Sequence, residues 1–304
     1  MTVVAIGLYV PDHYLFVDRL PMPGESVEVR RYVQSHGGKA ANQAVASALA
    51  GAATFFVGAV GADLAGRQGL AAMSAYGVDT SRASVVDGAA TGMSSIYLAP
   101  DGTQMIGTFA GAGARIDRGS VEAALKDLQP DIALLQGEVT AELALELVGA
   151  RIAPTVILDP SPADAFIGLS LEKCDIITPN SHEADLLVGS RQASASAVAD
   201  ATGVDVVIVT RGADGAEVFD RGTTTVLPGI DVHPCDASGA GDAFNGALAA
   251  ALDAGGCLLD AATAGIRASA WSVTREFCMP SYATAEELAS WRTGSTASAS
   301  KVAT

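Results

Sequence analysis

The sequence predicts an α/β protein whose mostly parallel central sheet is covered by helices on both faces. Short runs rich in β-branched residues alternate with alanine-rich helical stretches over most of the 304 residues, as in βαβ units. A hydrophobic content of 49% against 17% charged residues supplies enough apolar surface for one large buried core. The 33 glycines suit the many short turns that such a fold needs between its strands and helices.

The expected elements of this sheet and its helices follow one another in regular order. The strands are short β-branched runs at residues 3–7, 54–58, 132–135, 155–158, 175–178 and 206–210. The helices are the alanine-rich stretches between them, at residues 40–50, 64–76, 120–128, 141–150 and 183–188. After about residue 240 we expect the chain to be mainly helical.

Two stretches interrupt this alternation and predict a second structural unit. Residues 12–36 and 91–110 are strand-like, with turn signals at Pro23-Gly24 and Asp101-Gly102. Pairing between them would make a small β lid over a pocket, and the alternative is that they are edge strands of the main sheet. Residues 1–11, 37–90 and 111–293 would then form the α/β domain. The end of the chain, residues 294–304, has the composition of a disordered tail.

Composition and charge restrict the partners and the compartment. The net charge of -16, with only 18 Lys and Arg, argues against nucleic acid as a partner. The four cysteines are widely spaced and predict free thiols in a reducing cytoplasm. The N-terminus lacks a basic region, and no charge-free apolar run of about 18 residues occurs, so we expect neither a signal peptide nor a membrane span.

A glycine-rich motif at residues 236–248 is the strongest candidate for chemistry. A turn leads into an alanine-rich helix with Asp242 in its first turn, where helix amides and the dipole favour negative charge. The amides of Gly239, Ala240 and Gly241 would hold a transferring phosphoryl group, and Asp242 would act as catalytic base. The alternative is a tight turn with an acid placed for dipole complementarity. Because the sequence contains neither a P-loop nor a G-x-G-x-x-G after the first strand, a kinase here needs such a phosphate site.

A second motif, at residues 37–51, suits a polyol. Gly37 and Gly38 let a ligand approach the backbone, and Asn42 offers both a donor and an acceptor from the start of a helix. The alternative is an ordinary helix start with Asn42 as a local cap.

Together these motifs resemble the ribokinase-like (PfkB) carbohydrate kinase family over essentially the whole chain, and their sequences are most similar to those of ribokinases. Shorter family motifs lie between them in the same order: Pro23-Gly24-Glu25, Asp159-Pro160-Ser161-Pro162 and Thr178-Pro179-Asn180-Ser181-His182-Glu183. The resemblance implies a three-layer α/β/α sandwich with a small β-sheet lid. It also implies phosphoryl transfer from ATP to a primary hydroxyl of a sugar, with a ribose-like pentose favoured.

The resemblance also assigns residues to the sugar. Asp12, Gly38, Lys39, Asn42 and Glu138 would contact its hydroxyls. Family members often dimerise through their lids, and exposed edges of the two lid segments would suit a homodimer.

Further positions match the nucleotide and cation sites of the family. Asn180 and Glu183 would organise Mg²⁺ and its waters around the ATP phosphates, although Asn180 as N-cap with Glu183 at N3 also resembles a capping box. Residues matching the ATP-binding region are Thr210 and Gly212. Ligands implied for a monovalent cation, usually K⁺, are Asp236 and the carbonyl of Ser238.

Three departures from the ribokinase pattern bear on the substrate and the cation. Val10 stands where ribokinases place Asn, Phe277 replaces a glycine near the cation loop, and Gly111-Ala112-Gly113 lacks a usual terminal Asn. A kinase for another ketose, a sugar acid or a nucleoside therefore remains an alternative. A catalytically inactive sugar-binding sensor is the alternative from a different class.

Overall fold

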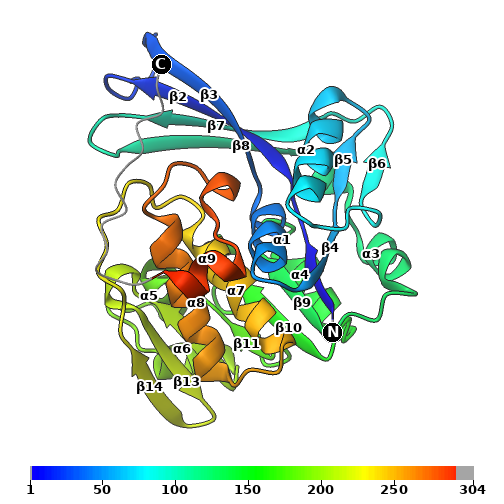
Figure 1. Cartoon of the computed structure of the whole chain (residues 1–304), viewed down its shortest axis with the longest axis vertical. Helices are drawn as coiled ribbons and strands as arrows, with labels where there is room; N and C mark the ends of the chain where they lie inside the picture. Colours follow the sequence, from blue (N-terminus) through cyan, green and yellow to red (C-terminus); the bar gives the residue numbers. More distant parts are fainter. Residues whose placement is uncertain (1, 292–304) are drawn as a thin grey trace.

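The structure is a computed structural model that describes residues 2–291 (Figure 1). It contains a large mixed sheet enclosed by helices and, above it in the figure, a separate four-stranded sheet. The strands of the large sheet are β1 (Thr2–Ile6), β4 (Ala53–Val57), β9 (Ile132–Gln136), β10 (Thr155–Asp159), β11 (Ile176–Ile177), β12 (Val206–Thr210), β13 (Ala216–Asp220) and β14 (Thr223–Leu227). The helices are α1 (Lys39–Leu49), α2 (Leu64–Ala75), α3 (Arg118–Leu125), α4 (Ala141–Gly149), α5 (Ser181–Val188), α6 (Ala195–Thr202), α7 (Ala240–Asp253), α8 (Leu258–Ser272) and α9 (Ala285–Ser290).

The large sheet has the strand order β14-β13-β12-β11-β10-β9-β1-β4. The strands from β4 to β12 run parallel, and β13 and β14 add an antiparallel edge. Since parallel strands end at the same side of a sheet, the loops after β9, β10 and β12 lie on one edge.

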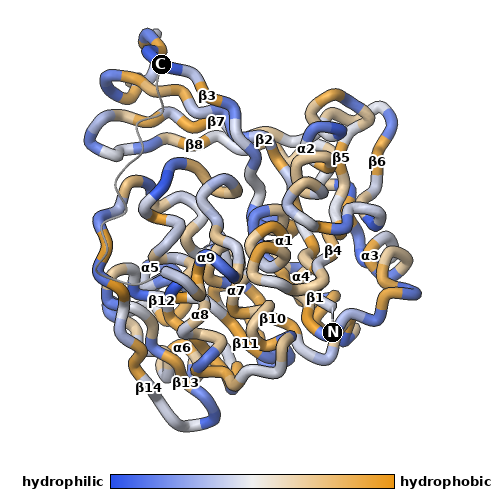
Figure 2. Tube along the Cα trace, in the orientation of Figure 1, coloured by the Kyte–Doolittle hydropathy of each residue, from blue (hydrophilic) through white to orange (hydrophobic). Residues whose placement is uncertain are grey.

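Alternate residues of each parallel strand enter two different hydrophobic cores. Val3 and Ala5 of β1 pack with α1, α7 and α8, whereas Val4 and Ile6 pack with α3, α4, α5 and α6. This alternation follows from the two-residue period of a strand, and it gives the three-layer α/β/α arrangement predicted from the sequence. In Figure 2 apolar colours gather around α1, β1 and β10 in the centre of the body.

The second sheet has the order β3-β2-β7-β8 and is built from the two stretches that interrupted the alternation. Its strands are β2 (Val10–Val17), β3 (Val29–Gly37), β7 (Thr91–Leu98) and β8 (Gln104–Gly111). Strands β2 and β7 pair in parallel, with Asp12 opposite Ser94, although they lie far apart in the sequence. The prediction of a small separate sheet is therefore confirmed, and the alternative of edge strands in the main sheet is wrong.

The remaining differences from the expected elements have local causes. The helix expected at 120–128 begins earlier, at Arg118, because Asp117 and Ser120 form a capping box. The strand expected at 175–178 is only Ile176–Ile177, and the Asp175 carboxylate beside it accepts the Val156 amide at 2.8 Å. A third small sheet pairs β5 (Ala59–Gly61) with β6 (Ser84–Val86). The predicted tail at 294–304 lies outside the described residues. Among the helices described, none is long and apolar enough to cross a membrane.

Candidate active site

Close packing of α1 against α7 creates the centre of the candidate site. A Cβ at Gly246 would lie 2.5 Å from the Ala46 Cβ and 2.7 Å from the Gln43 carbonyl oxygen, so the two helices approach as closely as glycine allows. This approach brings the first turns of the two helices together, and with them the two motifs found in the sequence.

Asp242 is buried at the start of α7, with 4% of its surface exposed. Asn42 Nδ2 donates to its Oδ2 at 2.9 Å, and Gln43 Nε2 donates to its Oδ1 at 3.1 Å. Asn42 is therefore not the local cap of α1, because Gly38 occupies the N-cap and Asn42 reaches across to α7. Two side-chain donors orient the Asp242 carboxylate.

Gly239 forms the N-cap of α7 in a left-handed conformation, with φ of 70°. A Cβ there would lie 2.5 Å from the Tyr282 Oη and 2.9 Å from the Cys278 Sγ, so the turn requires glycine. Within the described chain no side chain caps this helix end. The first-turn amides of α7, including those of Ala240 and Gly241, are therefore suited to an anionic ligand.

A buried polar network connects Asp242 to the ends of β9 and β10. Gln43 Nε2 also donates to Asp159 Oδ2 at 3.0 Å, and Gln43 Oε1 accepts from Gln136 Nε2 at 2.7 Å. Lys39 Nζ lies 3.3 Å from Asp159 Oδ2 and 3.9 Å from Asp242 Oδ1. One lysine thus sits between two buried carboxylates that Gln43 bridges.

The charges of this network shift the pKa values of its members. Burial raises the pKa of Asp159 to about 7, although Lys39 opposes the shift. Burial disfavours the Lys39 ammonium, but Asp159, Asp242, Glu138 and Glu183 outweigh it and raise the pKa of Lys39 above its usual value. The lysine stays charged because four carboxylates surround it.

Asp12 and Glu138 lie on the side of the network that faces the second sheet. Burial raises the pKa of Asp12 to about 6, opposed by a hydrogen bond with Ser94. Burial also raises the pKa of Glu138 to about 7, while its Oε2 accepts the Lys39 amide at 2.8 Å. A Cβ at Gly37 would collide with the Asp12 carboxylate, so this glycine makes room for the acid.

Gly38 and Asn42 complete this polar region. Gly38 has φ of 92°, and a Cβ there would lie 2.5 Å from the Leu8 carbonyl oxygen. Asn42 Oδ1 is buried and has no hydrogen-bond partner among residues 2–291. Since buried acceptors are normally paired, this oxygen is suited to accept a hydroxyl from a ligand.

Asn180 and Glu183 form the reciprocal capping box of α5. Asn180 Oδ1 accepts the Glu183 amide at 3.0 Å, and Glu183 Oε2 accepts the Asn180 amide at 2.8 Å. The capping interpretation is thus present in the structure. The charge of Glu183 also affects the pKa values of Lys39 and Asp159, so Glu183 is electrostatically part of the buried network around Asp242.

Across residues 2–291 there is no group of three or more His, Cys, Asp or Glu placed to hold a metal ion.

A cavity of about 440 Å³ lies on the opposite side of the α7 start. Thr210 and Gly212 line it, as does Gly241 from the first turn of α7. Its lining also includes the apolar side chains of Ile230, Val232, Phe244, Ile266 and Val273. An apolar cavity next to an anion-binding helix end suits a ligand with a flat ring and phosphates.

The Asp236 carboxylate organises the loop before α7. Its Oδ1 accepts the Ser238 amide at 2.8 Å, and its Oδ2 accepts the Phe277 amide at 2.9 Å. Phe277 adopts φ of 68°, so this chain keeps a backbone conformation that favours glycine despite the bulky residue.

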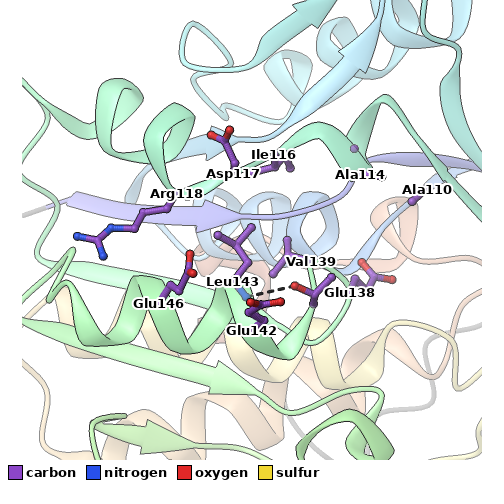
Figure 3. A pocket seen from close by; sticks show the side chains of 12 residues that line it. Ala110, Ala114, Ile116, Asp117, Arg118, Glu138, Val139, Glu142, Leu143 and Glu146 are labelled. Carbon is purple, nitrogen blue, oxygen red and sulfur yellow. Dashed lines mark hydrogen bonds between the residues drawn. The ribbon is translucent and has the colours of Figure 1, made fainter.

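A second cavity, of about 310 Å³, lies next to Glu138 (Figure 3). Small residues at Ala110, Gly113 and Ala114 form part of its lining. Acidic side chains also line it, at Asp117, Glu142 and Glu146, with Arg118 as a basic neighbour.

Sequence reasoning named most of these residues but missed the network that joins them. It assigned no role to Gln43 or Asp159, although both stood inside motifs that it singled out, and it did not use Gln136 at the end of a strand. The available signal was the polar residue type at each position, since Gln136 and Asp159 each follow a run of buried apolar residues at the end of a strand.

Comparison with known proteins agrees with this geometry. The sequence pattern of the pfkB family carbohydrate kinases matches residues 1–285. The ribokinase of Haemophilus influenzae is 32% identical over 296 residues, which cover 94% of this chain and 96% of that protein. The ribokinase structure from Thermotoga maritima superposes with a TM-score of 0.85 at 30% identity, covering 95% and 97% of the two chains. The structure of Arabidopsis thaliana ribokinase complexed with ribose and ATP has a TM-score of 0.82 at 25% identity, with the same coverage.

The protein belongs to the pfkB family of carbohydrate kinases. It is a phosphotransferase with an alcohol group as acceptor, of the ribokinase-like sugar and nucleoside kinases.

Proposed function

We propose that this protein transfers the γ-phosphoryl group of ATP to a primary hydroxyl of a sugar, with a ribose-like pentose favoured. The observation that carries the proposal is the position of Asp242. It is buried between the polar region of Asp12 and Asn42 and the cavity of Thr210 and Gly212, and two side chains orient its carboxylate.

Asp242 would accept the proton of the attacking hydroxyl as the hydroxyl approaches the γ-phosphorus. Phosphoryl transfer depends mainly on positioning and on stabilising negative charge, so the base needs orientation more than a strongly shifted pKa. Asn42 and Gln43 provide that orientation. The amides of Gly239, Ala240 and Gly241 at the start of α7 would stabilise the charge on the transferring group.

The sugar would bind on the side of the second sheet. Asp12 would accept hydrogen bonds from its hydroxyls, and the unpaired Oδ1 of Asn42 would accept another. Lys39 would donate hydrogen bonds to the sugar hydroxyls, and Glu138 would accept them. Val10 supplies no polar group, so one hydroxyl that Asn would contact in ribokinases must be recognised differently.

ATP would occupy the cavity lined by Thr210 and Gly212, with Asn180 near its phosphates. The ribokinase of Arabidopsis thaliana, solved with ribose and ATP, supports this arrangement by its similarity over nearly the whole chain.

Two metal ions are implied by the family, and each would take only one or two oxygen ligands from this chain. Glu183 would hold Mg²⁺ through water, because hard carboxylate oxygens are its preferred ligands and the phosphates would complete its shell. Mg²⁺ would neutralise charge on the phosphates. Asp236 and the Ser238 carbonyl would bind K⁺, and the glycine-like backbone of Phe277 keeps the Asp236 loop formed.

The second sheet would act as a lid formed by residues 12–36 and 91–110, and as a dimer surface. Its strands expose large apolar side chains, namely Val29, Tyr32, Met93, Met105, Ile106 and Phe109. Burying them in a homodimer would remove an exposed sheet surface. A monomeric mass by light scattering at micromolar concentration would contradict this assembly.

The use of ATP as substrate and the four free cysteines support the cytoplasm as the compartment of this protein.

The cavity beside Glu138 favours a nucleoside as the second candidate substrate. Its volume of about 310 Å³ and its small residues leave room for a substituent on the sugar. The acidic side chains of Asp117, Glu142 and Glu146 would repel a sugar acid. The sensor alternative is disfavoured because the base and its orienting residues are all in place.

The test is ATP consumption with a panel of pentoses, hexoses and nucleosides, with and without K⁺. We expect turnover with at least one sugar and its loss in Asp242→Asn, while sugar binding measured by calorimetry is retained. Full turnover in Asp242→Asn would refute the role of the base. Binding of a sugar without ATP consumption in the wild type would favour the sensor.

A further inference from the structure

Phe277 is an aromatic residue in a backbone conformation that favours glycine. Its φ of 68° lies in the left-handed region, which bulky residues seldom adopt. Its amide donates to Asp236 Oδ2 at 2.9 Å, a hydrogen bond that a glycine would make with less strain. Strained residues of this kind persist where the surrounding contacts hold them, often at functional sites.

The Phe277 ring packs on the second sheet. It meets Tyr14 of β2 edge-on, with ring centroids 5.1 Å apart and an interplanar angle of 65°. Tyr14 is 3% exposed and lies two residues from Asp12, so both side chains point to the same face of β2. The aromatic contact thus holds the strand that carries the proposed sugar-binding acid.

A neighbouring contact joins the same two segments. Arg31 of β3 forms an ion pair with Glu276 at 3.2 Å, and its guanidinium lies 4.5 Å from the centre of the Phe16 ring. This pair is half-exposed and therefore weak, so the aromatic contact, in which the Tyr14 ring is buried, is the stronger of the two. A cavity of about 740 Å³ lies between β2 and this loop, and both Tyr14 and Phe277 are part of its lining.

On its other side, Phe277 is connected to the start of α7. Asp236 accepts both the Phe277 amide and the Ser238 amide, and Ser238 precedes the N-cap Gly239. The Tyr282 hydroxyl donates to the Gly239 carbonyl oxygen at 3.2 Å and supports the turn from behind. A short series of contacts thus runs from β2 through Phe277 to the turn that presents Asp242.

We infer that Phe277 is a positioning residue that keeps strand β2 docked on the loop before α7 even when no sugar is bound. This inference rests on the proposed kinase function. Docking places Asp12 in position before the sugar arrives, so less ordering is needed on binding and the apparent affinity for the sugar rises. Neither Phe277 nor Tyr14 lines the ATP cavity, so the contact acts on the sugar side.

The test is Phe277→Gly, which removes the ring but keeps, and relaxes, the left-handed backbone. With the best substrate of the panel, we expect KM for the sugar to rise about 3- to 10-fold, the range of one aromatic pair. We expect kcat and KM for ATP to stay within about twofold of the wild type. Phe277→Tyr should restore the sugar KM.

A matched control separates the ring from the relief of strain. Gln129→Gly makes the same kind of change at an exposed residue with φ of 46°, far from the second sheet. Hydrogen exchange of the ligand-free protein should be faster at residues 10–17 and 29–37 in Phe277→Gly, and unchanged there in Gln129→Gly. This measurement does not require activity.

The outcomes are distinguishable from failure of the proposed function. An active wild type with an unchanged sugar KM in Phe277→Gly would overturn the inference and leave the kinase assignment intact. Unchanged exchange in β2 and β3 would overturn it whether or not a substrate is found. Equal rises of the KM for sugar and for ATP would also overturn it, because they would indicate a general disturbance of the site.

Discussion

Gln43 offers the sharpest test of the buried network. Its side chain is completely buried and makes three hydrogen bonds, to Asp159, Asp242 and Gln136. Gln43→Leu replaces it with an apolar side chain of similar size, so the change removes hydrogen bonds and leaves little cavity. Two buried carboxylates then each lose a donor.

The expected cost follows from those three bonds. A hydrogen bond to a charged group contributes about 1.5–3 kcal/mol and a neutral one about 1 kcal/mol, so the free energy of unfolding should fall by about 4–7 kcal/mol. With a urea m value of about 3 kcal/mol/M for a chain of this size, the unfolding midpoint should fall by about 1–2 M. Asp242 keeps Asn42 as a donor but loses half of its side-chain orientation, so kcat should fall about 10- to 100-fold.

The assay combines urea unfolding followed by circular dichroism with steady-state kinetics. Ser47→Ala is the matched control, because Ser47 is equally buried on the same helix and accepts one neutral hydrogen bond, from Thr54 Oγ1. It should cost about 1 kcal/mol and leave kcat unchanged. If Gln43→Leu changed kcat by less than twofold and moved the midpoint no further than Ser47→Ala, the bridging role would be refuted.

Three further predictions address the turn, the metal and the titration of the site. Gly239→Ala should lower both the melting temperature and kcat, because the added Cβ would collide with Tyr282 and Cys278. Gly241→Ala is the control: its added Cβ would have no atom within 4 Å, so the melting temperature should stay at the wild-type value. Glu183→Gln should retain the capping box and the melting temperature but weaken the apparent Mg²⁺ affinity about 10- to 100-fold. If the dependence of activity on Mg²⁺ did not change, Glu183 would act only as part of the capping box. Because the pKa of Asp12 is raised in the folded state, the folded protein binds more protons than the unfolded chain between pH 3.8 and about 6. This contribution to stability is complete below pH 3.8 and is lost as the pH rises to about 6. The melting temperature should therefore fall less steeply with rising pH in Asp12→Asn than in the wild type. The same dependence of melting temperature on pH in both proteins would contradict the raised pKa of Asp12.

Much of the fold could be predicted because its signals are local. The strand at 206–210 coincides with β12, and the helices expected at 40–50 and 141–150 differ from α1 and α4 by a single residue at their ends. Strand and helix periodicity depend on neighbouring residues, so they are visible in a single sequence. The order of the strands and the antiparallel β13–β14 edge were not predicted, because pairing between distant segments leaves no local pattern.

The sequence by itself determined which residue types were available for chemistry: an acid in the first turn of a helix, glycines before two helices, and polar groups for a sugar. Only the tertiary structure decided how they act together. Gln43 joins Asp159 and Asp242, which lie 116 and 199 positions away, and Phe277 meets Tyr14 across the gap between loop and second sheet. The physical reason is that burial, charge balance and hydrogen bonding depend on distance in space, and the packing of α1 against α7 sets those distances.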